Sequence, residues 1–337
     1  MATFSVPAVL TAAAVALACL GLGLAAEPPK VSSPPDLPDA PVAQAEVKHP
    51  LTVPPVPSEG AKPAAVGSKN FVVSAPTPVV ARALAAEAEH QRAVIARRWL
   101  GKELPDWAKP CELRFTTATT SNGASTLTFG KDADGKQALA TVSMDLRGDF
   151  LKVLSEVLPH EVTHAVLATA FARPLPRWAD EGLAISSESD DEQAVHDARC
   201  RELVNGGRGF RLKVLFTATE YPRDLIVLYA QGHSVARFLL HHAAGVPVLK
   251  DTPIVGRLFA AAGHQRLLTF IESGSRENTA ASWATAAKEV YGFASLDALE
   301  EEWLKWLAKP ETALPRKEES PTPKAADPNL IPPPKRP

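Results

Sequence analysis

The pattern of hydrophobic and polar positions divides the chain into an N-terminal part with strand-like alternation and a C-terminal part with helical spacing. The strand-like segments are short and cover residues 70–74, 111–117, 125–129 and 138–146. Residues 78–100 carry apolar side chains at three- and four-residue intervals, which predicts a helix. The N-terminal part is therefore expected to hold a small mixed β-sheet and one long helix.

From residue 149 onward the apolar positions keep helical spacing. The predicted helices cover residues 149–172, 189–204, 223–244, 264–273, 279–291 and 295–308. Gly245, Gly274 and Gly292 stand where three of them would end, as glycine commonly does. The predicted fold class is α+β, with a small mixed β-sheet N-terminal lobe followed by a mainly helical C-terminal lobe.

Proline sets the expected limits of the folded part. The chain has 337 residues and 31 prolines, which gather near both ends. Residues 27–67 are rich in Pro, Ala, Val and Ser and are expected to form an extended linker. Residues 310–337 form a Pro- and Lys-rich tail of the same kind. The resulting prediction is one folded domain over residues 68–309.

Residues 1–26 have the character of an export signal. The stretch from Val6 to Ala26 is almost wholly apolar, and it ends in small side chains just before the first charged residue, Glu27. Those small residues favour cleavage by a signal peptidase, although the stretch is also long enough to remain as a membrane tether. Lipidation at Cys19 is disfavoured, since the residues before it match a lipobox poorly. We expect a periplasmic, extracellular or membrane-anchored protein that faces outside the cytoplasm.

The charge balance argues against a nucleic-acid partner. The formal net charge is -2, and Lys and Arg are scattered along the sequence. Such a chain has no basic face to attract phosphates. The sequence gives no indication of an oligomeric state.

Two cysteines remain once Cys19 is assigned to the signal. Cys111 and Cys200 form an even pair in a compartment that permits a disulfide. They would otherwise be two separate buried thiols that behave as small apolar side chains. The sequence is compatible with both the disulfide and the two separate thiols.

An HExxH motif, His160-Glu161-Val162-Thr163-His164, lies within an apolar helix-forming stretch. With about 3.6 residues per turn, both histidines project from one helix face, so their imidazoles can bind one cation. Glu161 lies about 100° around the helix, where it can hydrogen-bond a water on that cation instead of binding the cation itself. Pro159 precedes the motif and predicts a kink or a restart of the helix there.

A zinc site with two imidazoles needs a third protein ligand. A metzincin would have glycine at position 167 and histidine at 170, but the chain has Leu167 and Ala170. Glu181 follows the motif after a turn marked by two prolines, and a returning helix would bring its carboxylate beside the histidines. We expect Zn²⁺ to be held by His160, His164 and Glu181.

These motifs resemble those of the gluzincin zinc metallopeptidases. The segment DEGLA at 180–184 is similar to the third-ligand segment of the aminopeptidase N family, and YAQG at 229–232 resembles its YxKG segment. From about residue 70 to 308 the chain looks like the compact bacterial peptidase MA-like proteins. The resemblance implies a zincin-like fold, a peptide or protein substrate, and an oxyanion-stabilising role for Tyr229. Gln231 replaces that family's lysine, and no segment like its acidic anchor for a substrate amino terminus precedes the motif helix.

Several residues near the motifs have plainer alternatives. Tyr229 would otherwise pack its ring in the interior, and His233 is either a second candidate for the oxyanion donor or a partly exposed helical histidine. Asp180 would orient a ligating imidazole, or only stabilise the start of a helix. The acidic segment 188–192 is expected to cap the next helix instead of binding calcium. His241-His242 is expected on a helix surface.

The reaction expected from these residues is hydrolysis of a peptide bond. Zinc would polarise the scissile carbonyl and acidify its water, while Glu161 takes the proton and later delivers it to the leaving amine. One alternative is an inactive zinc-stabilised module that binds a cell-envelope protein or glycan. Another is a latent enzyme whose groove is closed by its own linker, residues 27–67.

Overall fold

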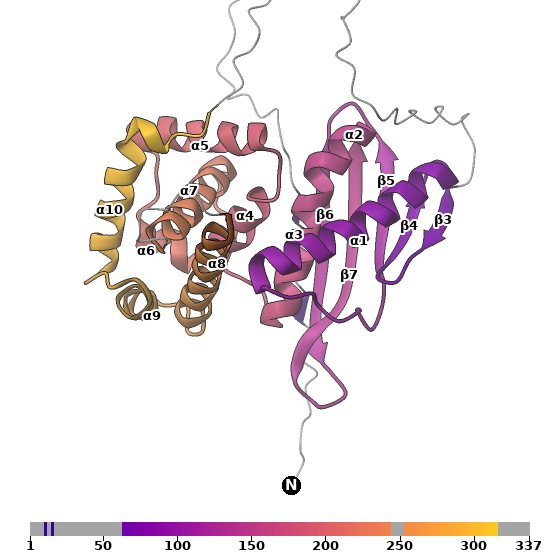
Figure 1. Ribbon diagram of the computed structural model, residues 1–337, viewed down its shortest axis with the longest axis horizontal. Coiled ribbons are helices and arrows are strands. Elements are labelled where there is room, and N and C mark those ends of the chain that lie inside the picture. The colour runs from indigo at the N-terminus through magenta and orange to yellow at the C-terminus, as the bar shows by residue number, and fades with distance from the viewer. Residues whose placement is uncertain (1–9, 12–14, 17–62, 244–252, 316–337) are drawn as a thin grey trace, which may run out of the picture. The chain divides into compact units, whose positions relative to one another are not determined.

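The computed structural model describes residues 10–11, 15–16, 63–243 and 253–315 (Figure 1). The chain divides into two compact units, Met1–Arg92 with Pro105–Glu161, and Ala93–Leu104 with Val162–Pro337. The division passes through two continuous helices, α1 (Pro78–Leu100) and α3 (Leu158–Phe171).

The first unit is built on a mixed sheet. Its five main strands are β3 (Ala64–Gly67), β4 (Phe71–Ala75), β5 (Cys111–Thr117), β6 (Asn122–Lys131) and β7 (Gln137–Gly148). They lie in the order β6-β7-β5-β4-β3, with β4, β5 and β7 parallel and the two outer strands antiparallel to their neighbours. Two-residue strands β1 (Leu10–Thr11) and β2 (Val15–Ala16) pair antiparallel with β6.

One face of this sheet is buried. Burial alternates along the strands, as expected for a sheet with one covered face. Glu89 of α1 accepts hydrogen bonds from Ser68 and from the backbone N–H of Asn70, which ties the helix to the start of β4. On β6, Gly123 lies against Val157. The covered face therefore meets the segment that leads into the HExxH motif.

That segment is a helix with a π-helical insertion. It starts with α2 (Phe150–Lys152), where the carboxylate of Asp149 accepts hydrogen bonds from two backbone N–H groups, and continues through the π-helical turn Val153–Val157 into α3. Pro159 has no N–H to donate to the preceding turn, and a wider π turn is one way a helix accommodates such a gap. The interruption predicted at Pro159 is thus a local widening, and the helix continues through the motif.

The second unit is helical. Its elements are α4 (Arg177–Ile185), α5 (Asp190–Asn205), α6 (Leu212–Thr217), α7 (Leu225–Ala243), α8 (Pro253–Ser275), α9 (Ala280–Ala286), the π-helical η2 (Ala287–Tyr291), α10 (Leu296–Ala308) and the 3₁₀ turn η3 (Pro310–Thr312). Trp178 of α4 packs against Phe216, Phe270 and Trp283, and all four rings are completely buried. This aromatic cluster anchors α4 in the core of the unit.

The predicted α+β class and the order of sheet and helices are confirmed. The predicted bounds of α1 and β5 match the structure, and Gly292 ends η2 with a positive φ of 81°. Gly274 lies inside α8 and ends no helix, which corrects that prediction. The strand β3 and the short helix α6 were not predicted.

Both expected chain ends need correction at their inner borders. Residues 64–67, assigned to the linker, pair as β3 with β4. Beyond residue 309, Thr312 accepts hydrogen bonds from Arg201 and Arg237, so the ordered part extends past the predicted limit. The expected export signal, apart from β1 and β2, and most of the linker and tail lie outside the described residues. None of the helices in the described ranges combines the length and the hydrophobicity that a membrane span requires.

The two cysteines are separate buried thiols. Cys111 in β5 and Cys200 in α5 are both free and completely buried. The disulfide alternative is therefore wrong, because each side chain is enclosed in the core around its own element. Burial raises the pKa of Cys200 to about 12, so this thiol stays protonated and unreactive.

Candidate metal centre

Two histidines of the HExxH motif lie one turn apart on α3, as predicted. His160 and His164 are both fully buried. With Glu181 they form a group whose ligand atoms all lie within 4.8 Å of one another. Among the described residues, this is the group of histidine, cysteine and acidic side chains that is compact enough to hold a metal ion.

Glu181 reaches this group from α4, the returning helix predicted from the sequence. Its Oε2 lies 3.8 Å from Nε2 of His164, and neither side chain is exposed. Its other oxygen, Oε1, accepts a hydrogen bond of 2.7 Å from the hydroxyl of Tyr221. The two oxygens of Glu181 therefore have different neighbours, and Oε2 is the one turned toward the histidine.

Close backbone packing fixes the position of α4. A Cβ added to Gly182 would come within 2.5 Å of the carbonyl carbon of Gly232 in α7. A Cβ on Gly232 would in turn come within 2.5 Å of the carbonyl oxygen of Trp178. The glycines of the DEGLA and YAQG segments are thus needed where α4 crosses α7. This contact joins two motifs that lie about fifty residues apart in the sequence.

Asp180 orients the imidazole of His164. Its Oδ1 lies 2.8 Å from Nδ1 of that ring. Because a carboxylate accepts, the contact places the ring proton on Nδ1 and turns the lone pair of Nε2 toward Glu181. Of the two interpretations of Asp180 from the sequence, the orienting one fits this geometry.

Glu161 is held from the sheet side within the first unit. The hydroxyl of Ser125 in β6 donates a 2.5 Å hydrogen bond to its Oε2. A Cβ at Gly123 would come within 2.6 Å of its Oε1, so β6 leaves room for this carboxylate only because position 123 is glycine. Glu161 itself is fully buried.

Tyr229 and His233 both lie on α7. Tyr229 is in the second turn of the helix and is 9% exposed. His233 is fully buried, which corrects its expected partial exposure, and its Nδ1 lies 3.5 Å from the hydroxyl of Ser186. Burial, aided by the nearby His196 and Arg237, holds the pKa of His233 well below its usual range. His233 is thus a neutral interior group packed against α4.

Two residues of the site were missed by sequence reasoning. Tyr221 lies in the loop before α7, and Ser125 lies in a strand 36 residues before Glu161. Neither belongs to a motif, and only the fold brings them to their carboxylates. Burial and the charge of Glu181 raise the pKa of Tyr221, so its hydroxyl stays protonated and donates.

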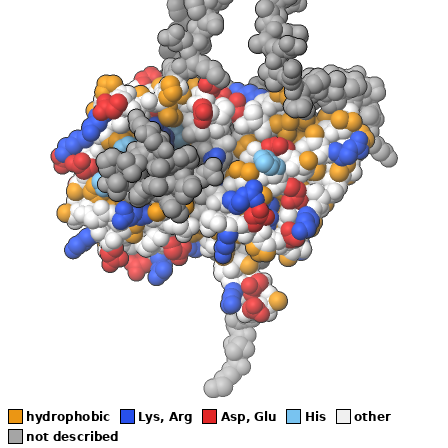
Figure 2. Space-filling model, viewed as in Figure 1, with side chains coloured by type: hydrophobic (Ala, Val, Ile, Leu, Met, Phe, Trp, Pro, Cys, Tyr) orange, Lys and Arg blue, Asp and Glu red, His pale blue; other side chains and the backbone are white. Residues whose placement is uncertain are grey.

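The acidic segment 188–192 and the His241-His242 pair lie where their non-catalytic interpretations predicted them. The acidic segment lies at the start of α5, where the hydroxyl of Ser189 accepts a hydrogen bond from the backbone N–H of Glu192. His241 and His242 are exposed at the end of α7, as predicted. On the face shown in Figure 2, Lys and Arg side chains are interspersed with Asp and Glu side chains.

The donor set fits zinc better than a hard cation. Two imidazole nitrogens and one carboxylate oxygen are the protein ligands of many catalytic zinc sites, which keep a fourth position for water or substrate. Calcium and magnesium prefer sets of oxygens. The three side chains are buried together, and the histidine that faces Glu181 is already oriented by Asp180. The residues present therefore suit Zn²⁺.

No protein-family model, curated protein or solved structure matches the chain.

Proposed function

We propose that this chain is a zinc-dependent peptidase of the gluzincin type, with His160, His164 and Glu181 as the metal ligands. One observation carries the proposal. The two histidines and the carboxylate that the motifs single out lie buried within 4.8 Å of one another. As part of the same proposal, we assign the chain a zincin-like fold.

The roles of the protein groups follow from where they lie. Bound zinc would polarise the scissile carbonyl and lower the pKa of water. Glu161 would take a proton from the attacking water and deliver it to the leaving amine. The hydroxyl of Ser125 would keep the Glu161 carboxylate in one rotamer, since it bonds one carboxylate oxygen. Tyr229, on the helix packed against α4, would donate to the oxyanion.

The test is a pair of substitutions with separate readouts. Glu161→Gln is expected to keep one zinc per chain, because Glu161 is no ligand, and to abolish cleavage of a proteome-derived peptide library. His164→Ala is expected to lose both zinc and cleavage. A Glu161→Gln variant that cleaves peptides as fast as the parent would show that the base is assigned wrongly.

A second candidate is an inactive zinc-stabilised module that binds a cell-envelope protein or glycan. The observation that favours it is the complete burial of His160, Glu161, His164 and Glu181, since the substrate of a zinc peptidase has to reach the open position on the metal. In that case the parent would bind zinc and gain stability from it, yet no peptide of the library would be cleaved. Release of product with zinc-loaded protein but not with chelated protein decides for the peptidase.

The proposed place of action is outside the cytoplasm, with the apolar segment 6–26 as signal or tether. The support is the sequence of that segment alone. Fractionation of cells that express the full chain tests it. Recovery of the protein from the cytoplasmic fraction, with its first residues intact, would contradict it.

A further inference from the structure

The carboxylate of Glu181 is held by a residue from a distant loop. Tyr221 lies between α6 and α7, 40 residues beyond Glu181, and its hydroxyl donates to Oε1. A hydrogen bond to one oxygen of a carboxylate fixes the rotation of the whole group. Here it leaves Oε2 facing Nε2 of His164 at 3.8 Å.

Tyr221 is itself fixed by Arg177, the first residue of α4. The guanidinium carbon lies 4.5 Å from the centre of the Tyr221 ring, which is a cation–π arrangement. The Nε of Arg177 donates a hydrogen bond to the backbone carbonyl of Thr219, and the Nη1 of Arg177 lies 3.5 Å from the Tyr221 hydroxyl. One arginine therefore binds both the ring and the backbone of the loop that carries Tyr221.

Arg177 also adjoins the partner of a histidine ligand. Its Nη1 lies 4.0 Å from Oδ2 of Asp180, whose other oxygen contacts His164. The side chains of Arg177 and Asp180 are 13% and 8% exposed. Little water screens the two charges, so the attraction between them is stronger than at a surface.

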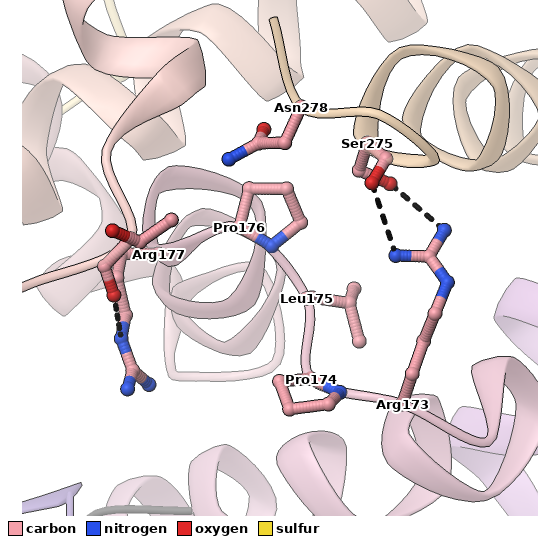
Figure 3. A pocket seen from close by; sticks show the side chains of 8 residues that line it. Arg173, Pro174, Leu175, Pro176, Arg177, Ser275 and Asn278 are labelled. Carbon is pink, nitrogen blue, oxygen red and sulfur yellow. Dashed lines mark hydrogen bonds between the residues drawn. The ribbon is translucent and has the colours of Figure 1, made fainter.

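The turn before α4 is also bound to the end of α8, through Arg173. Figure 3 shows Arg173 and Arg177 extending from the turn in different directions, with Pro174, Leu175 and Pro176 between them. The guanidinium of Arg173 donates to the hydroxyl of Ser275 at 2.9 Å, while Arg177 reaches the loop of Tyr221. A cavity of about 140 Å³ lies between these residues. The start of α4 is thus anchored independently of any metal.

From these contacts we infer that Tyr221, held by Arg177, is a positioning residue for the metal centre. It orients Glu181 so that a single oxygen, Oε2, is presented to the cation. The inference rests on the proposed function for its metal site. It adds a residue that no motif contains, and it explains why the loop between α6 and α7 is fastened to the first turn of α4.

The test is the affinity for zinc, measured by competition with a chromophoric chelator. Tyr221→Phe keeps the ring and removes only the hydroxyl, and it is expected to weaken binding by about tenfold, as loss of an orienting partner typically does. Arg177→Lys keeps the charge but loses the planar group over the ring, and a smaller weakening of a few fold is expected. The absorption spectrum of the cobalt-substituted protein should change in Tyr221→Phe, because Oε1 of Glu181 then loses this hydrogen bond and can also bind the ion.

Tyr291→Phe is the matched control. Tyr291 is half-buried, and its hydroxyl is shielded from solvent and has no hydrogen-bond partner within the described part of the chain. Its loss should leave zinc affinity and the cobalt spectrum unchanged. The free energy of unfolding of each metal-free variant in urea separates positioning from general destabilisation.

The outcomes distinguish the two claims. If Tyr221→Phe and Arg177→Lys bind zinc as tightly as Tyr291→Phe does, the positioning role is wrong while the metal site stands. If the parent itself binds no zinc, or keeps it after His164→Ala, the metal site is wrong and the inference is overturned with it. Weaker binding with an unchanged unfolding free energy supports the positioning role.

Discussion

Gly182 of α4 meets Gly232 of α7 so closely that a Cβ on Gly182 would lie 2.5 Å from the carbonyl carbon of Gly232. Alanine at a helix-interior position normally stabilises by up to about 1 kcal/mol over glycine. Here the methyl group would force the two helices apart. We expect Gly182→Ala to lower the free energy of unfolding by about 1–3 kcal/mol, as overpacking does, and to weaken zinc binding because Glu181 is the neighbouring residue.

Gly67→Ala is the control for this substitution. A Cβ on Gly67 in β3 would have no atom within 4 Å, and the φ of this residue is not positive. Its unfolding free energy in urea should stay within about 0.5 kcal/mol of the parent, the range of ordinary surface substitutions. Equal stability of both alanine variants would mean that α4 and α7 do not pack through these glycines.

Ser125 and Glu161 give a prediction for catalysis. Ser125→Ala removes one hydrogen bond that orients the carboxylate of the proposed base, since this serine donates to its Oε2. We expect kcat to fall by roughly tenfold, about 1.4 kcal/mol of activation free energy, while zinc content is unchanged. Ser143→Ala on the opposite face of the sheet is the control and should match the parent. A kcat that is identical in both variants argues against a role for Ser125.

The sequence predicted the residues that share an element and missed those that only the fold brings together. His160, His164 and Glu161 follow from the geometry of one helix turn. Glu181 could be predicted as the third ligand because two prolines mark the turn between two helices. Tyr221 and Ser125 lie 40 and 36 residues from the carboxylates they bind, and nothing local in the sequence marks their positions.

The elements that were missed are short or atypical in composition. The strand β3 has four residues, lies in an Ala- and Pro-rich stretch and exists through its pairing with β4. Helix α6 has six residues, too few for helical spacing to be distinguished from a short apolar run. The free state of Cys111 and Cys200 depends on which core encloses each side chain, and the spacing of cysteines carries no such information.

His233 predicts a pH dependence of stability. Burial, with His196 of α5 and Arg237 of α7 nearby, lowers its pKa in the folded state, while the hydroxyl of Ser186, the residue after α4, lies 3.5 Å from the ring. Below about pH 6.5, the ordinary histidine pKa, the unfolded chain gains a proton that folded His233 does not take. The unfolding free energy should therefore fall, by up to about 1.4 kcal/mol per pH unit from this one group.

The measurement is urea unfolding from about pH 7.5 to about pH 5, a range that spans the ordinary histidine pKa, with a chelator present to keep the protein metal-free. His233→Gln should reduce the slope below about pH 6.5, even if it also lowers stability at every pH. His241→Gln, at the exposed end of α7, serves as the control and should keep the parent's slope. If His233→Gln and the parent lose stability in parallel as the pH falls, folded His233 binds its proton normally.

Asp180 supplies the sharpest test of how the metal ligands are oriented. Asp180→Asn keeps the size of the side chain, but an amide can present its NH₂ to Nδ1 of His164 and so favour the tautomer with the proton on Nε2, the atom that faces Glu181. We expect zinc affinity to fall by about 10- to 100-fold, the usual cost of losing such a partner. Asp190→Asn changes an acid in the first turn of α5 and should leave the affinity unchanged. Equal affinities for the two asparagine variants would mean that the 2.8 Å contact with Asp180 does not set the tautomer of His164, and the ligand role of Nε2 would then need another explanation.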